Sequence, residues 1–168
     1  MIQLAAEGQG KLEALNGGKE WEIRHPLVSA SEEQTNAVHH VLGSKDFVIS
    51  FKGPAGAGKT ELMSEAVTAI ESLSSKGVML LAPSSPSVEV LRAQGFARAN
   101  TLQQFELNPE LQQAVKGQVL WVDEAGFLSV HQMLRLEELA IEHNCRLVVT
   151  GDKEQAPMVF NGAMLCEY

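Results

Sequence analysis

The stretch from Gly53 to Thr60 reads Gly-Pro-Ala-Gly-Ala-Gly-Lys-Thr and could bind phosphate. It fits the pattern G-x-x-x-x-G-K-[ST], in which glycines let successive backbone N–H groups point at one phosphate. Lys59, exposed in the loop, would reach the β- and γ-phosphates, and the Thr60 hydroxyl would hold Mg²⁺. The apolar run 47–51 and the helical spacing from residue 60 onward supply the strand and helix that the motif requires. The pattern therefore predicts a site for a Mg²⁺-nucleotide rather than an ordinary glycine-rich turn.

Two acidic residues, Asp123 and Glu124, come directly after the apolar run 119–122. Ligands of α/β sheets lie at the carboxyl ends of the strands, so we expect both carboxylates beside the phosphate loop. Asp123 would bind the metal through water, and Glu124 would orient or deprotonate an attacking water. The alternative is a solvated acidic turn, but the preceding phosphate loop favours the catalytic interpretation.

A third polar segment, residues 151–155, follows the apolar run 146–150. An amide at Gln155 could contact the γ-phosphate and respond to its loss, as the coupling of hydrolysis to movement requires. Without the other two motifs Gln155 would be interpreted as an ordinary polar loop residue.

Apolar runs alternate with helical patterns along the chain, which predicts an α/β fold with right-handed crossovers. The apolar runs are nearly continuous, as in a parallel sheet that is covered on both faces. The expected strands are 47–51, 77–83, 119–122 and 146–150, and the expected helices are 31–43, 60–74, 86–94, 101–107 and 130–144. We therefore expect a three-layer α/β/α domain with a mainly parallel sheet, in which strand 47–51 lies near the centre beside strand 146–150.

Residues 1–30 are expected to form an N-terminal arm that packs on a domain of residues 31–168. The arm is polar and broken by glycines, which predicts a short N-terminal helix followed by irregular chain. Ser31, or Ser29, can cap the next helix. The side chains that could attach the arm to the domain are Trp21, Ile23, Leu27 and Val28.

The composition limits the possible functions. The 168 residues are 45% hydrophobic, enough for the core of one domain, and the net charge is −8 without a Lys/Arg cluster. This charge argues against bulk coating of nucleic acid, so we expect any affinity for DNA to be weak and salt-sensitive. The sequence shows neither a signal peptide nor an apolar run of membrane-spanning length, and Cys145 and Cys166 lack metal-like spacing. We expect a cytoplasmic protein, no membrane partner, and a solvated acidic face formed by Glu137, Glu138 and Glu142.

The motifs together resemble a known family. The segments 53–60, 122–126 and 151–155 resemble motifs I, II and III of superfamily 1 DNA helicases of the RecD-like, 5′-to-3′ type. Other segments resemble the Q motif, motif Ia and the stretch that follows motif Ia; these are 31–38, 81–95 and 99–105. The combination, together with residues 1–10, is most similar to the helicase part of TraI/TrwC-type conjugative relaxases, and the resemblance covers nearly the whole chain.

This resemblance implies a RecA-like P-loop NTPase domain, the first of two motor domains, which binds ATP and Mg²⁺ and couples hydrolysis to movement on single-stranded DNA. It implies that Gln34 recognises the adenine edge and that Gln155 senses the γ-phosphate. The catalytic residues that it implies are Lys59, Glu124 and Gln155, and the metal ligands are Thr60 and Asp123. The implied nucleotide contacts are Gln34, Gly53, Pro54, Ala55, Gly56, Ala57, Gly58, Lys59, Thr60 and Glu61. The implied DNA contacts are Ser84, Ser85 and Thr101.

The chain also departs from the family pattern. Ser84 stands where motif Ia often has Thr, and Ala156 follows Gln155 where relaxase relatives commonly have His. The sequence shows no later arginine-bearing motif and no relaxase nickase site. We therefore expect the first motor domain only, with the second RecA-like domain in the parent chain. An arginine finger contributes a factor of roughly 10³–10⁵ in related enzymes, so we expect the domain to be nearly inactive in isolation.

Three other functions remain open at this point. One is a fragment of a RecD-like repair helicase, and another is a nucleotide-dependent binding or scaffold module without turnover. The third is a kinase, which the paired acids Asp123 and Glu124 disfavour, because a motor needs a base for water whereas a kinase must exclude water.

Overall fold

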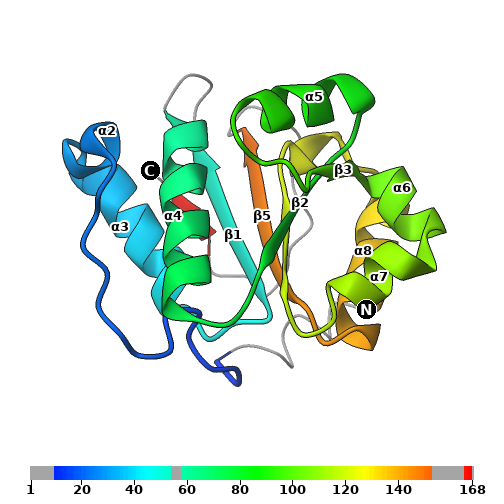
Figure 1. Ribbon diagram of the computed structural model, residues 1–168, viewed down its shortest axis with the longest axis horizontal. Helices are drawn as coiled ribbons and strands as arrows, with labels where there is room; N and C mark the ends of the chain where they lie inside the picture. Colours follow the sequence, from blue (N-terminus) through cyan, green and yellow to red (C-terminus); the bar gives the residue numbers. More distant parts are fainter. Residues whose placement is uncertain (1–9, 54–57, 153–164, 168) are drawn as a thin grey trace.

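The computed structural model describes residues 10–53, 58–152 and 165–167, and these ranges form a sheet with helices on both faces (Figure 1). The sheet order is β3-β2-β4-β5-β1-β6, and the paired strands run parallel. The strands are β1 (Val48–Gly53), β2 (Val78–Ala82), β3 (Asn100–Thr101), β4 (Val119–Val122), β5 (Arg146–Asp152) and β6 (Leu165–Glu167). The predicted three-layer α/β/α architecture with a parallel sheet is therefore confirmed.

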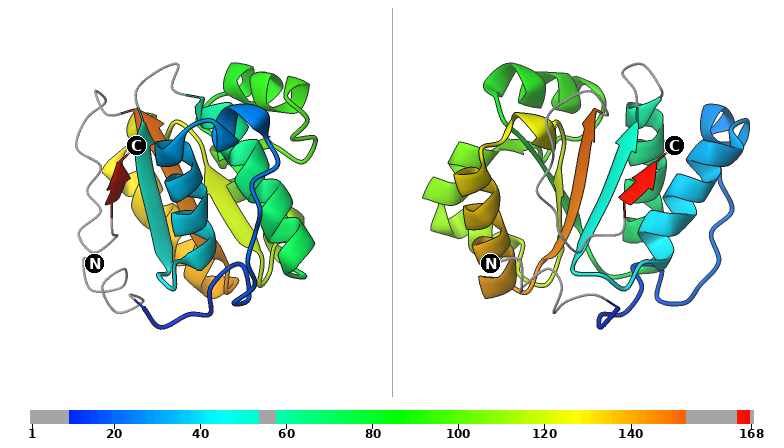
Figure 2. Two further views of the ribbon diagram at one scale, coloured as in Figure 1. Left: turned by 90° about the vertical axis from the view of Figure 1, so that its left-hand side faces the viewer. Right: turned by 180° about the vertical axis from the view of Figure 1, so that it is seen from behind.

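The helices divide between the two faces of the sheet (Figures 1 and 2). The face with the larger core carries α2 (Pro26–Ser29), α3 (Glu32–Gly43), α4 (Lys59–Leu73) and α5 (Ser85–Ala93). The other face carries α6 (Leu102–Leu107), α7 (Pro109–Ala114) and α8 (Val130–Glu142). Between β4 and α8 the chain makes one 3-10 turn, η1 (Ala125–Phe127).

Some elements differ from the sequence prediction. β1 lies beside β5 as expected. Its predicted position near the centre is wrong, because β1 is next to the edge strand β6 and the centre is occupied by β4 and β5. The strands β3 and β6 are two and three residues long, too short to give a periodic pattern. Helix α7 has no buried residue, so apolar spacing in the sequence could not identify it. The expected N-terminal helix lies outside the described residues, and residues 10–25 form neither helix nor strand.

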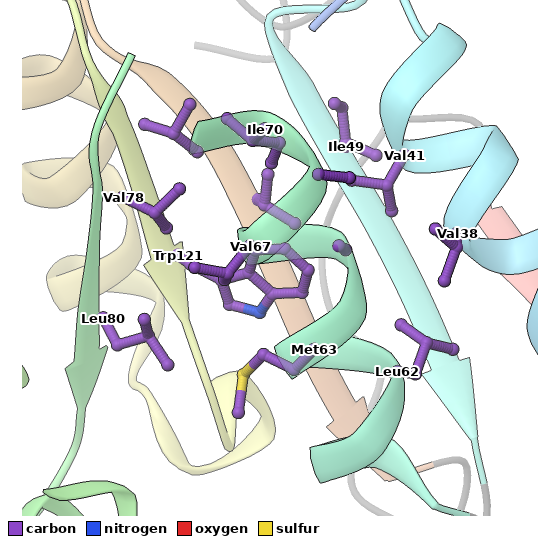
Figure 3. Packing of buried hydrophobic residues seen from close by; sticks show 14 of the residues in the cluster. Val38, Val41, Ile49, Leu62, Met63, Val67, Ile70, Val78, Leu80 and Trp121 are labelled. Carbon is purple, nitrogen blue, oxygen red and sulfur yellow. The ribbon is translucent and has the colours of Figure 1, made fainter. Parts of the chain in front are cut away.

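The larger core fixes α4, and with it the residues after the phosphate loop, on the sheet. Trp121 of β4 is fully buried in this core. Its ring meets that of Phe51 edge to face, with the centroids 5.6 Å apart. Figure 3 shows Trp121 behind α4 with Met63 and Val67, which belong to the same core cluster. The N-terminus of α4 is thereby positioned relative to the ends of β1 and β4.

The N-terminal segment is anchored to α4 by a buried carboxylate. Glu65 is 5% exposed and accepts a hydrogen bond from the Trp21 indole N–H at 2.7 Å. It also accepts the backbone N–H groups of Arg24 and His25 at 2.9 and 2.8 Å. These three donors satisfy a carboxylate that would otherwise be costly to bury. The guanidinium of Arg24 lies 4.4 Å from the centroid of the Trp21 ring, which adds a cation–π contact.

The predicted anchoring side chains are confirmed except for one. Trp21 and Val28 are buried, and Ile23 packs against the core. Leu27 is 63% exposed, so its predicted packing is wrong. α2 is a single turn of four residues, and Val28 occupies the side that faces the core.

A buried arginine ties both the N-terminal segment and the connection between α3 and β1 to β5. Arg146 is 5% exposed, and its guanidinium donates to the backbone carbonyls of Asp46, of Glu13 at 2.8 Å and of Ser44 at 2.5 Å. Burial lowers the pKa of Arg146 to about 10, against the opposing influence of the Asp46 charge. Three carbonyls therefore depend on one cation for their hydrogen bonds.

Arg146→Met is expected to lower the free energy of unfolding by about 3 kcal/mol, because it removes the buried guanidinium that donates to these three partly buried carbonyls. Urea unfolding followed by circular dichroism measures this change. Arg135→Met is the control, because Arg135 is half-exposed on α8 and forms a solvent-exposed ion pair with Glu138; we expect a change below about 0.5 kcal/mol. Equal stability of the two variants would contradict the anchoring role of Arg146.

Candidate nucleotide site

The predicted phosphate loop connects the end of β1 to the start of α4. Pro54, Ala55, Gly56 and Ala57 lie outside the described residues, and the structure describes the loop's two ends. Lys59 is the first residue of α4 and is half-buried, so the prediction of an exposed loop lysine is wrong. The helix begins one residue earlier than the sequence suggested because Gly58 already forms its cap.

Gly58 brings the loop and Gln34 into close proximity. Its backbone is left-handed, with φ +74°, and a β-carbon there would lie 2.5 Å from Gln34 Nε2. Both the conformation and the space therefore require glycine. Glu61 Oε2 would lie 3.5 Å from the same point. The structure thus gathers three of the predicted nucleotide contacts, Gln34, Gly58 and Glu61, at the start of α4.

Gln34 reaches this point because α3 begins just before it. The Ser31 hydroxyl caps the helix by accepting the backbone N–H of Gln34 at 3.3 Å, which settles the choice between Ser31 and Ser29. The first turn of α3 therefore lies near the cap of α4, since Gln34 approaches Gly58. A role for Gln34 in recognising adenine stays a prediction.

Asp123 follows β4 and is fixed by the neighbouring strand. Its Oδ1 accepts the Thr150 hydroxyl at 2.9 Å and the backbone N–H of Glu124 at 2.9 Å. Burial raises the pKa of Asp123, and the negative charge of Glu124 adds to this effect. The two hydrogen bonds and the positive charge of Lys59 act in the opposite direction. A cation bound next to Asp123 would favour the charged form of this buried carboxylate.

Glu124 projects from a strained backbone toward α5. Its φ of 54° is unusual for a residue other than glycine. Its Oε2 accepts the hydroxyl of Ser87 at 2.6 Å, and the Ser87 oxygen lies 2.9 Å from that of Ser84. In the sequence Ser87 is recognisable only as part of the expected helix 86–94, so this contact was missed, and no local signal identifies it.

Thr60, Asp123 and Glu124 border one pocket of about 260 Å³. Thr60 belongs to α4, and Asp123 and Glu124 follow β4. The wall from α5 consists of Pro86, Ser87, Val90, Leu91 and Gln94. The described part of the chain has no cluster of three or more His, Cys, Asp or Glu side chains that could hold a metal. One hydroxyl and one carboxylate nevertheless fit Mg²⁺, which is usually held by few protein groups together with phosphate oxygens and water.

The strand register brings the third motif to the same edge. β1 and β5 pair from Val48 with Leu147 to Gly53 with Asp152, so the loop begins beside the predicted segment 151–155. Gln155 lies outside the described residues, and its role stays a prediction.

The predicted DNA contacts lie at the start of α5 and of α6. Ser84 and Ser85 are exposed, and Ser84 caps α5. Thr101 is 8% exposed, and its hydroxyl accepts the Gln104 backbone N–H at 3.1 Å as the cap of α6. Thr101 therefore offers little free surface in this structure, and all three DNA contacts stay predictions.

Further sequence predictions concern residues outside the pocket. Glu138 and Glu142 are exposed, but Glu137 is 8% exposed and burial raises its pKa, so the acidic face is not wholly solvated. The pattern of three acids could not show that Glu137 falls beside the buried residues of α8. Cys145 is buried, and burial raises its pKa to about 11. None of the described helices combines the length and the apolar character needed to cross a membrane.

The chain is similar to known proteins over most of its length. The family described as AAA domain matches residues 29–167. Over 135 residues the chain is 33% identical to the probable conjugal transfer protein TraA of Sinorhizobium fredii and 30% identical to the conjugal transfer protein TraA of Rhizobium radiobacter. Each match covers 79% of this chain and 12% of the relative, so the chain spans only a small part of these proteins.

Solved helicase structures share the fold. The Pif1 helicase of Candida albicans matches 82% of this chain and 40% of its own, with a TM-score of 0.60 and 18% identity. The UvsW helicase of bacteriophage T4 matches 96% of this chain and 66% of its own, with a TM-score of 0.63 and 13% identity. Together with the family match, these similarities agree with the resemblance that motifs I to III indicated.

Proposed function

Because the chain belongs to the AAA domain family, we propose that it is the ATP-binding motor domain of a superfamily 1 DNA helicase. The observation that carries this proposal is the shared pocket of Thr60, Asp123 and Glu124 beside the phosphate loop. The similarity to two conjugal transfer proteins supports the narrower proposal that the parent protein is a conjugative relaxase-helicase.

Each residue of the pocket has a role in this proposal. Lys59 and the backbone N–H groups of the loop bind the phosphates, and the Thr60 hydroxyl and Asp123 hold Mg²⁺. When bound, Mg²⁺ neutralises charge on the phosphates. Glu124 orients the attacking water and accepts its proton. Gln34 contacts the base from the α3 side of the loop, where the structure places its amide.

Movement on single-stranded DNA requires more than this domain. Translocation needs two units that close on ATP and open after its loss, each holding the strand in turn. We propose that Ser84 and Ser85 contribute to one of these grips, since they are exposed at the carboxyl end of β2, next to the pocket. The second RecA-like domain of the parent chain supplies the other grip.

The 168-residue chain is therefore expected to bind single strands weakly and not to unwind duplex DNA. Its net charge of −8 provides no strong field for the phosphate backbone. Fluorescence anisotropy with a labelled oligonucleotide at several salt concentrations measures the first property, and a strand-displacement assay with ATP measures the second. An affinity for single strands that does not change with salt concentration would contradict the proposal of a single incomplete motor. ATP-dependent unwinding by the chain alone would also contradict it.

A further inference from the structure

The contact between Ser87 and Glu124 joins two parts of the site that are 37 residues apart in sequence. Ser87 lies in the first turn of α5, which follows β2, and Glu124 follows β4, the strand that pairs with β2. At 2.6 Å, the hydroxyl-to-carboxylate hydrogen bond is of the short, charge-assisted kind, which is stronger than a bond between neutral groups.

The hydrogen bonds of this group run in one direction. Ser87 has a single hydroxyl hydrogen, which it donates to the carboxylate of Glu124. In the 2.9 Å contact between the two serine hydroxyls, Ser84 must therefore be the donor. The resulting chain begins at Ser84, which is exposed, passes through Ser87 and ends on Glu124. Successive hydrogen bonds of this kind polarise and strengthen one another.

The contact with Ser87 restricts Glu124, the group proposed to accept a proton from water. A general base needs an oxygen that is free to face the water, within hydrogen-bond reach. The Ser87 hydroxyl occupies one oxygen of Glu124 and holds the side chain against α5. Thr60, Ser87 and Glu124 border the same pocket, so a released carboxylate would still face the site.

We propose that Ser87 is a positioning residue that holds Glu124 against α5 in a resting arrangement, and that ATP hydrolysis requires this hydrogen bond to break. The inference rests on the proposed function and adds a means of regulating the same site. Because Ser84 is exposed and donates to Ser87, an anionic ligand that accepted the Ser84 hydrogen would weaken the restraint. A strand phosphate at the start of α5 would have this effect.

Ser87→Ala is expected to increase single-turnover phosphate release from saturating MgATP about ten-fold, the order of effect of a charge-assisted hydrogen bond. Its affinity for MgATP should not change, because the substitution leaves the phosphate loop intact. Ser87→Thr keeps a hydroxyl at this position and should restore the slow rate. Ser74→Ala is the matched control, since the Ser74 hydroxyl bonds to the Ile70 carbonyl at the other end of α4.

Two further variants show whether the effect passes through this chain of hydrogen bonds. Ser84→Ala should raise the rate by a smaller factor, and it should have no further effect in the Ser87→Ala background. Adding Glu124→Gln to Ser87→Ala should abolish the gain. A rate that is unchanged in Ser87→Ala would overturn the proposal. A slower rate that Ser87→Thr restores would also overturn it, because Ser87 would then align Glu124 for hydrolysis.

A measurement without nucleotide separates this inference from the proposed function. The ¹³C resonance of the Glu124 carboxyl carbon should move in Ser87→Ala, return in Ser87→Thr and stay unchanged in Ser74→Ala. Failure of that resonance to move would overturn the role of Ser87 alone. Absence of MgATP binding by the unsubstituted chain in calorimetry would instead overturn the proposed function, and with it the role of Ser87 in hydrolysis.

Discussion

Lys59→Ala is expected to weaken MgATP binding about 100-fold, which corresponds to roughly 3 kcal/mol. Lys59 begins α4 at the phosphate loop, and its charge already influences the buried carboxylate of Asp123. A lysine in this position donates charge-assisted hydrogen bonds to phosphate oxygens, which alanine cannot replace. Isothermal titration calorimetry of the two proteins with MgATP measures the difference.

The fold of this variant should be intact, because the buried residues of α4 that pack on the sheet are unchanged. Thermal unfolding checks this expectation. Lys76→Ala is a suitable control, since Lys76 lies just before β2, at the opposite end of the sheet, and bonds to the Gly117 carbonyl at 2.9 Å. We expect this control to bind MgATP normally. Equal affinity of Lys59→Ala and the unsubstituted chain would show that the loop is not the nucleotide site.

Glu124→Gln is expected to bind MgATP normally and to lose the residual hydrolysis by a factor of at least about 100, the lower range for a general base. The amide has the shape of the carboxylate, and its oxygen can still accept the Ser87 hydroxyl, so the pocket should keep its form. What the variant loses is the ability to take a proton from water. Single-turnover phosphate release is the appropriate assay, because the isolated domain is expected to be slow.

Glu138→Gln provides the control for this substitution, since Glu138 is exposed on α8 and borders no part of the pocket. It should hydrolyse ATP at the rate of the unsubstituted chain. If Glu124→Gln also kept that rate, Glu124 would have no catalytic role, and the nucleotide-dependent binding module without turnover would become the better interpretation.

The sequence determined those features that depend on neighbours along the chain. The order of strands and helices, the cap at Ser31 and the burial of Trp121 were predictable. So was the position of Asp123 at the end of a strand. Each rests on a local cause: apolar periodicity matches the repeat of a helix or strand, and a capping side chain bonds to a backbone group three residues away. The phosphate-loop pattern is local in the same sense.

The tertiary structure decided the features that join distant segments. The position of β1 next to the edge strand β6 follows from which strands pair. The sequence of a strand does not specify which other strands pair with it. The burial of Glu137 and the exposure of Leu27 depend on what packs over α8 and α2. The bond from Ser87 to Glu124 exists because β2 and β4 are adjacent, so that the residues after them meet. Spacing along a chain records local conformational preference, whereas these contacts depend on how the sheet orders its strands, and that order is set by the packing of the whole domain.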